Sequence, residues 1–111
     1  MSATTAYKIL TAEQWAAWQA SGVFTGAPVD LVDGYIHLST ADQVTATVDK
    51  HFAGQTDLFV VSIDLPSLGD TIRWERARGG ALFPHVYCPL PLAAALTAIP
   101  LRRDNGAVAL E

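Results

Sequence analysis

Two stretches of the chain carry side chains that can exchange protons or hold a charged ligand. In the first stretch, polar residues alternate with apolar ones: Asp33-Gly34-Tyr35-Ile36-His37-Leu38-Ser39. A period of two is typical of a strand, so Tyr35, His37 and Ser39 are expected to share one face. Imidazole titrates near neutral pH, which makes His37 a candidate general acid or base, or a hydrogen-bond donor to a ribose or phosphate.

The second stretch spans residues 73 to 87 and begins with a carboxylate among three guanidinium groups. Glu75 lies between Arg73 and Arg76, and Arg78 follows two positions later. Guanidinium groups can hold a phosphate through two-point contacts, so the three arginines are candidates for binding an anionic ligand. A solvated hairpin with surface ion pairs is the alternative interpretation.

The same stretch ends in a second imidazole. His85 and Tyr87 alternate along a predicted strand, as the first histidine and its neighbouring hydroxyls do. If the two stretches meet in space, they form one polar site on a largely apolar protein. The candidate catalytic residues are then His37, Glu75 and His85, and the candidate ligand-binding residues are Tyr35, Ser39, Arg73, Arg76, Arg78 and Tyr87.

Several of these residues also have a purely structural interpretation. A lone histidine such as His37 is often satisfied within a sheet by a backbone carbonyl, and Tyr87 could be a partly buried aromatic whose hydroxyl finds a partner. His51, beside Phe52, is predicted to be structural. No His-x-x-x-His or Cys-x-x-Cys pair occurs in the sequence, so a metal site is not expected. Cys88 lacks the signs of an activated thiolate.

The composition describes one globular domain spanning residues 1–111. Half of the residues are hydrophobic and 16% are charged. The net charge of −4 argues against binding to extended nucleic acid, which needs clustered basic residues, but five of the seven basic residues are arginines that suit a small anionic ligand. The single cysteine excludes an internal disulfide, and no stretch resembles a signal peptide or a spanning helix, so we expect a cytoplasmic protein without membrane contact.

The first half of the chain is predicted to alternate strands with helices. A strand over residues 7–10 precedes a helix over residues 12–20, which begins with the capping box Thr11-Ala12-Glu13-Gln14 and is stopped by Gly22. Residues 24–32 show no clear period and are predicted to form a loop over the sheet edge.

A second helix is expected after the strand that carries the first histidine. Ser39 or Thr40 can supply its N-cap, Val44 and Val48 share one side, and Gly54 ends it.

The remaining half is predicted to consist mostly of strands. The expected strands cover residues 57–64, 71–75 and 82–87, with a turn at 66–69. Residues 92–101 are apolar enough for a short helical turn that leads into a buried strand, and Asn105-Gly106 should join strands over 99–102 and 107–110 in a hairpin. The order predicts an α+β domain with two helices packed on a mostly antiparallel split sheet.

The motifs together closely resemble those of a bacterial family known as domain of unknown function 952. The resemblance covers nearly the whole chain and rests on Asp33-Gly34-Tyr35-Ile36-His37-Leu38-Ser39, His51-Phe52, Leu68-Gly69-Asp70, Arg73-Trp74-Glu75 and Gly79-Gly80-Ala81-Leu82-Phe83-Pro84-His85-Val86-Tyr87. That family is grouped with the ADP-ribosyltransferase-like superfamily, which includes ADP-ribosyltransferases and NAD-dependent RNA 2′-phosphotransferases. The resemblance implies the fold of that superfamily and a pocket for NAD or an ADP-ribose-type nucleotide.

The superfamily pattern matches this chain in one element and departs from it in another. Its members carry an early-strand histidine, a small residue and then Ser or Thr against the NAD ribose, and His37-Leu38-Ser39 is similar to that element, with Leu38 where glycine is common. They also carry a stacking Tyr or His, for which Tyr87 and His85 are candidates, and a late glutamate. Glu75 comes earlier than that pattern suggests, so a nucleotide-ribose pocket is implied more strongly than ADP-ribosyl transfer.

Three functions therefore stay open for this chain. The first is transfer from NAD, with Glu75 stabilising positive charge at the anomeric carbon, or with the arginines holding an RNA 2′-phosphate. The second is a non-catalytic module that binds a small nucleotide or a partner protein. The third is a two-histidine phosphoesterase, in which His37-Leu38-Ser39 and His85-Val86-Tyr87 are the paired motifs, although Tyr87 replaces the usual Ser or Thr.

Overall fold

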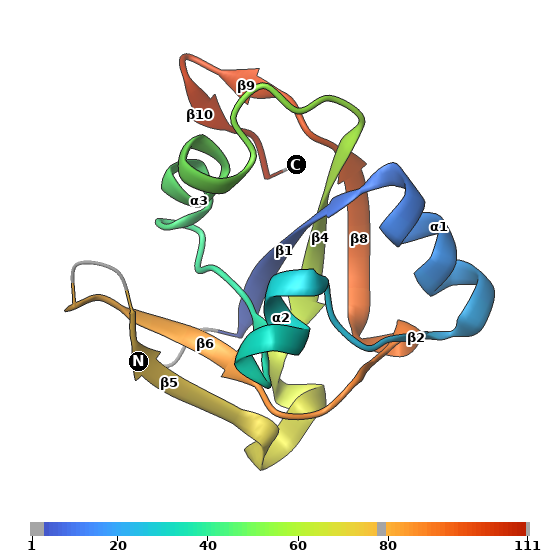
Figure 1. Ribbon diagram of the computed structural model, residues 1–111. Helices are drawn as coiled ribbons and strands as arrows, with labels where there is room; N and C mark the ends of the chain where they lie inside the picture. The colour runs from blue at the N-terminus through green and yellow to red at the C-terminus, as the bar shows by residue number, and fades with distance from the viewer. Residues whose placement is uncertain (1–3, 78–79, 111) are drawn as a thin grey trace.

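A computed structural model describes residues 4–77 and 80–110 of the chain and shows a small α+β domain (Figure 1). Two three-stranded antiparallel sheets form its framework. The predicted α+β class is confirmed. The prediction of two helices is wrong, because the described residues form three α-helices and two short 3-10 segments.

The first sheet has the strand order β1-β4-β8, and its central strand is the most apolar. Its strands are β1 Thr5–Thr11, β4 Leu58–Asp64 and β8 Ala95–Pro100. Strand β4 pairs with both neighbours, Ile9↔Val60 on one side and Val60↔Ile99 on the other. The predicted core strand over 57–64 is thus confirmed. Strand β8 exists as predicted, but it lies at the sheet edge and is half-exposed rather than buried.

The second sheet carries both polar stretches that the sequence singles out. Its strand order is β3-β6-β5, with β3 Ile36–His37, β6 Leu82–Val86 and β5 Ile72–Arg76. Ile36 and Leu38 are buried, which confirms the predicted apolar face. The two sheets are joined by an isolated bridge in which Tyr7 and Ser39 exchange backbone hydrogen bonds of 2.8 and 2.9 Å.

Helix α1, Ala12–Ser21, follows directly from β1 as the sequence predicts. The hydroxyl of Thr11 accepts from the amide N–H of Gln14, and the side-chain carbonyl of Gln14 accepts from the amide N–H of Thr11, so the capping box is present. Gly22 ends the helix with a φ of 82°, a conformation that glycine adopts without a steric penalty.

The loop predicted over residues 24–32 is wrong. Strand β2, Val23–Phe24, comes first, and helix α2, Pro28–Asp33, follows. Proline suits the first position of a helix because its missing N–H would be unpaired there anyway. The helix is only six residues long, and three of its apolar side chains are exposed, so no helical period is visible in the sequence: Val29, Leu31 and Val32.

Helix α3, Val44–His51, is the predicted second helix with a different beginning and end. Neither expected N-cap residue caps it: Ser39 pairs its hydroxyl with Thr47, and the N-cap position is Gln43. The helix ends at His51, three residues before Gly54. Val44 and Val48 are buried together, so the predicted apolar side is confirmed.

The remaining elements are short. The 3-10 segment Leu65–Thr71 replaces the predicted turn, β7 Leu90–Pro91 pairs with β2, and a 3-10 turn at Leu92–Ala94 leads into β8. The hairpin at Asn105-Gly106 is present, but it joins β9 Arg103–Asp104 to β10 Ala107–Val108. The predicted partner strand was wrong because Ile99 pairs with Val60 of β4 instead.

The core is divided between the two faces of the first sheet. On one face α1 packs through Trp18 against Leu10 and Val61, and on the other α3 packs through Val48 against Val60. Within residues 4–77 and 80–110, no helix has the length and apolar character needed to cross a membrane. The two sheets and the three helices leave a cavity between them, and this cavity holds the candidate site.

Candidate functional site

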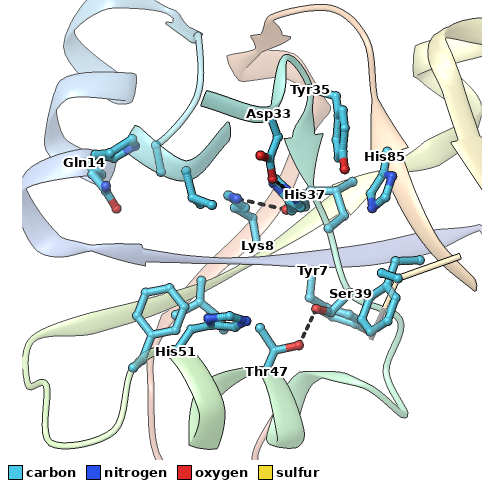
Figure 2. A pocket seen from close by; sticks show the side chains of 18 of the residues that line it. Tyr7, Lys8, Gln14, Asp33, Tyr35, His37, Ser39, Thr47, His51 and His85 are labelled. Carbon is cyan, nitrogen blue, oxygen red and sulfur yellow. Dashed lines mark hydrogen bonds and ion pairs between the residues drawn. The ribbon is translucent and has the colours of Figure 1, made fainter. Parts of the chain in front are cut away.

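A cavity of about 660 Å³ opens between the two sheets, bordered by the start of α1, by α2 and by α3. Four of the predicted site residues line it: Tyr35, His37, Ser39 and His85. Figure 2 shows Tyr35, His37 and His85 side by side in one part of the cavity, with Gln14 and His51 on the opposite side of the view. Its volume lies within the range of small-molecule sites, which runs from about 300 to 1,000 Å³.

The structure brings the two polar stretches together in this cavity wall. His37 and His85 are direct cross-strand partners in the β3–β6 ladder, with ring centroids 5.3 Å apart. The ring of Tyr35 stacks on His85 at 4.2 Å and lies 4.7 Å from His37. Partners in a non-slipped antiparallel register point to the same face, which is why the two histidines converge.

The buried carboxylate of Asp30 holds His37 in place. Oδ1 of Asp30 lies 2.6 Å from Nδ1 of His37 and also accepts the backbone N–H of His37 at 3.1 Å. Oδ2 accepts the backbone N–H of Ala27 at 2.7 Å. One side chain therefore ties the start of α2 to strand β3 and fixes the orientation of the His37 ring.

Lys8 completes this buried network. Its ammonium donates to Asp30 at 3.0 and 3.1 Å and to the backbone carbonyl of His37 at 2.9 Å. Burial alone would raise the pKa of Asp30, but the hydrogen bond from His37 and the charge of Lys8 outweigh burial and hold that pKa below its ordinary value. Burial lowers the pKa of Lys8, and Asp30 offsets part of that shift.

A second carboxylate meets His37 from the cavity side. Oδ2 of Asp33 lies 3.0 Å from Nε2 of His37, and the Asp33 side chain is 41% exposed. Both ring nitrogens of His37 therefore face carboxylate oxygens. Burial, followed by the charges of Asp33 and Glu75, raises the pKa of the Tyr35 hydroxyl.

His85 has a carboxylate partner of its own on the neighbouring strand. Oε1 of Glu75 lies 2.8 Å from Nδ1 of His85, and the hydroxyl of Tyr87 donates to the same oxygen at 2.7 Å. These two hydrogen bonds lower the pKa of Glu75, and the bond to Glu75 raises the pKa of Tyr87. Glu75 and Tyr87 do not line the cavity. Glu75 is connected to the cavity through His85, and Tyr87 is connected to it through Glu75.

The three arginines are not placed alike. Arg73 pairs with His85 in the β5–β6 ladder, so it shares that face, and its guanidinium lies 5.5 Å from the ring centre of Tyr87. Arg76 follows Glu75 directly in the strand and therefore points to the opposite face, where it donates to the carbonyl of Gly80 at 2.7 Å. Arg78 lies outside the described residues.

The opposite wall of the cavity is built by β1 and α3. The hydroxyls of Ser39 and Thr47 lie 2.9 Å apart, which links the segment after β3 to α3 along the cavity wall. His51, which the sequence predicts to be structural, lines the cavity together with Phe52. Within the described part of the chain, no group of three or more His, Cys, Asp and Glu side chains is arranged to hold a metal ion.

Sequence reasoning missed Lys8, Asp30 and Asp33. Lys8 sits in an otherwise apolar strand on the same side as Ala6 and Leu10, and a lysine in such a position needs a buried partner. Asp30 is likewise surrounded in sequence by Val29 and Leu31. These two charges inside apolar runs are the available signal, although their pairing across 22 positions is not visible in the sequence.

The fold and the cavity define a small α+β domain with a pair of carboxylate-bound histidines between two antiparallel sheets. Residues 9–98 match the profile of the family described as protein of unknown function DUF952, and the chain belongs to this family. The predicted family membership is thus confirmed.

Solved structures of protein CC0527 from Caulobacter crescentus share this fold. Its crystal structure is 42% identical in sequence with a TM-score of 0.88, and the match covers 96% of this chain and 95% of that chain. Its solution NMR structure, also 42% identical, has a TM-score of 0.81 and is matched over 91% of its length. No curated protein matches the sequence.

Proposed function

We propose that the cavity binds a ribonucleotide of the NAD or ADP-ribose type, and that the domain is a relative of the ADP-ribosyltransferase-like superfamily. The observation that carries this proposal is the convergence of Tyr35, His37 and His85 on one wall of a cavity of about 660 Å³. His37-Leu38-Ser39 is the element that resembles the ribose-binding strand of that superfamily. Its histidine and its serine both line the cavity.

The chemistry of the wall suits a ribose and its base. A carboxylate beside a cavity can accept hydrogen bonds from a ribose diol, as acidic residues do in dinucleotide-binding domains. Among the described residues, Asp33 supplies the carboxylate that lines this cavity. Aromatic rings bind planar bases by stacking, and Tyr35 is an aromatic residue that lines the cavity. Arg73 is the cross-strand partner of His85 on the same face of the sheet. We expect it to contact a phosphate group of the bound ligand that extends out of the cavity past His85.

The same pocket suits either transfer from NAD or binding without turnover. Transfer requires a negative group close to the anomeric carbon, where positive charge develops. Glu75 acts on the cavity through His85, whereas Asp33 reaches it directly. A non-catalytic module would use the same ribose contacts and release its ligand unchanged.

One observation favours phosphoester cleavage as a second candidate. His37 and His85 lie side by side, and each has a carboxylate on its Nδ1 atom. Two oriented imidazoles can act as base and acid in the cleavage of a cyclic phosphate. This candidate predicts turnover of a 2′,3′-cyclic nucleotide and no requirement for NAD.

Calorimetry with NAD, ADP-ribose and a 2′,3′-cyclic nucleotide tests these proposals. We expect saturable binding of NAD or ADP-ribose, weakened about tenfold or more in His37→Ala. The substitution removes the ring that orients the cavity-lining carboxylate of Asp33, and one such hydrogen-bonding contact contributes about 1–3 kcal/mol. Trp74→Ala is the matched control, since Trp74 lies on the opposite face of the same sheet and is 41% exposed. Absence of binding, or equal binding by both variants, contradicts the ribose pocket, and binding of the cyclic nucleotide alone favours the second candidate.

A further inference from the structure

The two histidines of the cavity have unequal surroundings. Both ring nitrogens of His37 face carboxylates, Asp30 at Nδ1 and Asp33 at Nε2. His85 has a carboxylate at Nδ1 only, and no hydrogen-bond partner lies at its Nε2 atom among residues 4–77 and 80–110. Since His85 lines the cavity, its Nε2 atom is the imidazole nitrogen that a bound ligand can reach without displacing a protein group.

Although Nε2 of His85 has no hydrogen-bond partner within the described ranges, it is not a fully buried polar atom. Among the described side chains, the atom that is fully buried and unpaired is Nε1 of Trp18. The His85 residue as a whole is 2% exposed, so its ring is enclosed by protein apart from the cavity that it lines. An enclosed imidazole whose second ring nitrogen has no protein partner is suited to taking a proton from a bound ligand.

Glu75 determines which nitrogen of His85 carries the proton. An ionised carboxylate only accepts hydrogen bonds, so Nδ1 of His85 must be the donor across the 2.8 Å contact. In the neutral ring, Nε2 then carries the lone pair. Tyr87 donates to the same oxygen of Glu75, and Tyr35 stacks on the ring, so both the carboxylate and the imidazole plane are held in place.

We propose that His85 is the general base of this site, that Glu75 and Tyr87 are positioning residues, and that the site activates a hydroxyl group to attack a ribose carbon. This proposal rests on the nucleotide pocket proposed above and deepens it by naming the group that accepts the proton. The carboxylate behind the ring would stabilise the imidazolium formed when His85 takes a proton, as the aspartate of a serine-protease triad does.

The proton and electron balance of this step needs no second acid. The hydroxyl oxygen of water or of an acceptor forms a bond to the anomeric carbon, and its proton moves to Nε2 of His85. The bond from that carbon to the nicotinamide nitrogen breaks, and its electron pair neutralises the pyridinium charge. Nicotinamide therefore leaves without a proton, and His85 later releases one proton to solvent.

Cleavage of a phosphoester is balanced differently and fits the geometry less well. Its leaving alkoxide needs a proton from a second group, and His37 is the neighbour that would have to supply it. The Nε2 atom of His37 is directed at Asp33 at 3.0 Å, so a proton there is held by a carboxylate rather than offered to a ligand. Within the described residues, the site thus has one accessible general base and no accessible general acid. This combination favours a substrate whose leaving group is a positively charged nitrogen base, because such a group departs without taking up a proton.

Imidazole ¹⁵N NMR tests the base assignment without any ligand. At a pH where the imidazole ring is neutral, we expect His85 to show a protonated Nδ1 and a bare Nε2. The signal of each histidine is assigned by its own substitution to glutamine. Glu75→Gln, which removes the charge, should shift the His85 proton toward Nε2, whereas Glu13→Gln, which removes an exposed carboxylate on α1, should leave it unchanged.

The outcomes separate this inference from the pocket on which it rests. A wild-type His85 that is protonated at Nε2, or a tautomer that does not respond to Glu75→Gln, overturns the assignment of His85 and Glu75. Addition of ADP-ribose to the same sample should shift the Nε2 resonance of His85. If the tautomers are as expected but ADP-ribose moves none of the histidine signals, the nucleotide pocket fails and the orientation of His85 by Glu75 stands.

Discussion

His37 and His85 face each other across the β3–β6 ladder, with ring centroids 5.3 Å apart, and each meets a different carboxylate at its Nδ1 atom. The carboxylate at His37 is buried and comes from helix α2, 7 positions earlier in the chain. The carboxylate at His85 is half-exposed and comes from strand β5, 10 positions earlier. The two imidazoles therefore differ in their partners within the described part of the chain: His37 meets carboxylates at both ring nitrogens, and His85 meets one at Nδ1 alone.

Asp30→Asn is expected to destabilise the fold by about 3–5 kcal/mol, because it leaves the ammonium of Lys8 buried without its counter-charge. Urea unfolding followed by tryptophan fluorescence measures this loss. Asp49→Asn is the matched control, since Asp49 pairs with Arg103 at 2.6 Å on the surface, where such pairs contribute about 0–1 kcal/mol. Equal losses in the two variants would show that the buried network contributes nothing beyond a surface pair.

Acid is expected to remove the contribution of the Asp30 network. The pKa of Asp30 in the folded protein lies below its ordinary value of 3.8, so its stabilisation is fully present above that value and is lost as the pH falls through the lower, folded pKa. Urea unfolding of wild type and Asp30→Asn from about pH 5 to pH 2 measures the difference. The two stabilities should converge below pH 3.8, and a constant difference would contradict the assignment.

Thr11→Ala is expected to lower stability by about 1 kcal/mol, because it removes the hydroxyl that accepts from the amide of Gln14. For a domain of this size, that loss corresponds to a fall in Tm of about 4–8 °C. Thr11→Ser keeps the hydroxyl and should remain close to wild type in a thermal melt. If serine and alanine destabilise equally, the capping box is not the source of the effect.

Gly34→Ala is expected to destabilise by about 1–2 kcal/mol, because Gly34 ends α2 with a φ of 88° that other residues adopt at a cost. No heavy atom lies within 4 Å of the Cβ that alanine would add, so the cost is one of backbone conformation rather than collision. Gly34→Asn should lose less, since asparagine tolerates this conformation better. Comparable melts for alanine and wild type would contradict this account.

Local patterns predicted much of the framework. The capping box places the start of α1, the apolar run places β4, and the period of two places Tyr35 and His37 on the face opposite Ile36. The same period places Arg76 and Glu75 on opposite faces of β5, so the two do not share one site as their adjacency in the sequence suggests. Helix α2 was missed because a six-residue helix with exposed apolar side chains has no periodic signal.

The family, the α+β class and the residue types of the site can all be predicted from the sequence, since they depend on local periodicity and on motifs within one stretch. Three relationships become visible only in the folded chain: the two histidines are cross-strand partners, Lys8 and Asp30 pair beside His37, and Glu75 contacts the cavity-lining His85. The physical reason is that these contacts depend on strand register and on the closure of long loops. A single sequence encodes both only through the packing of the whole chain.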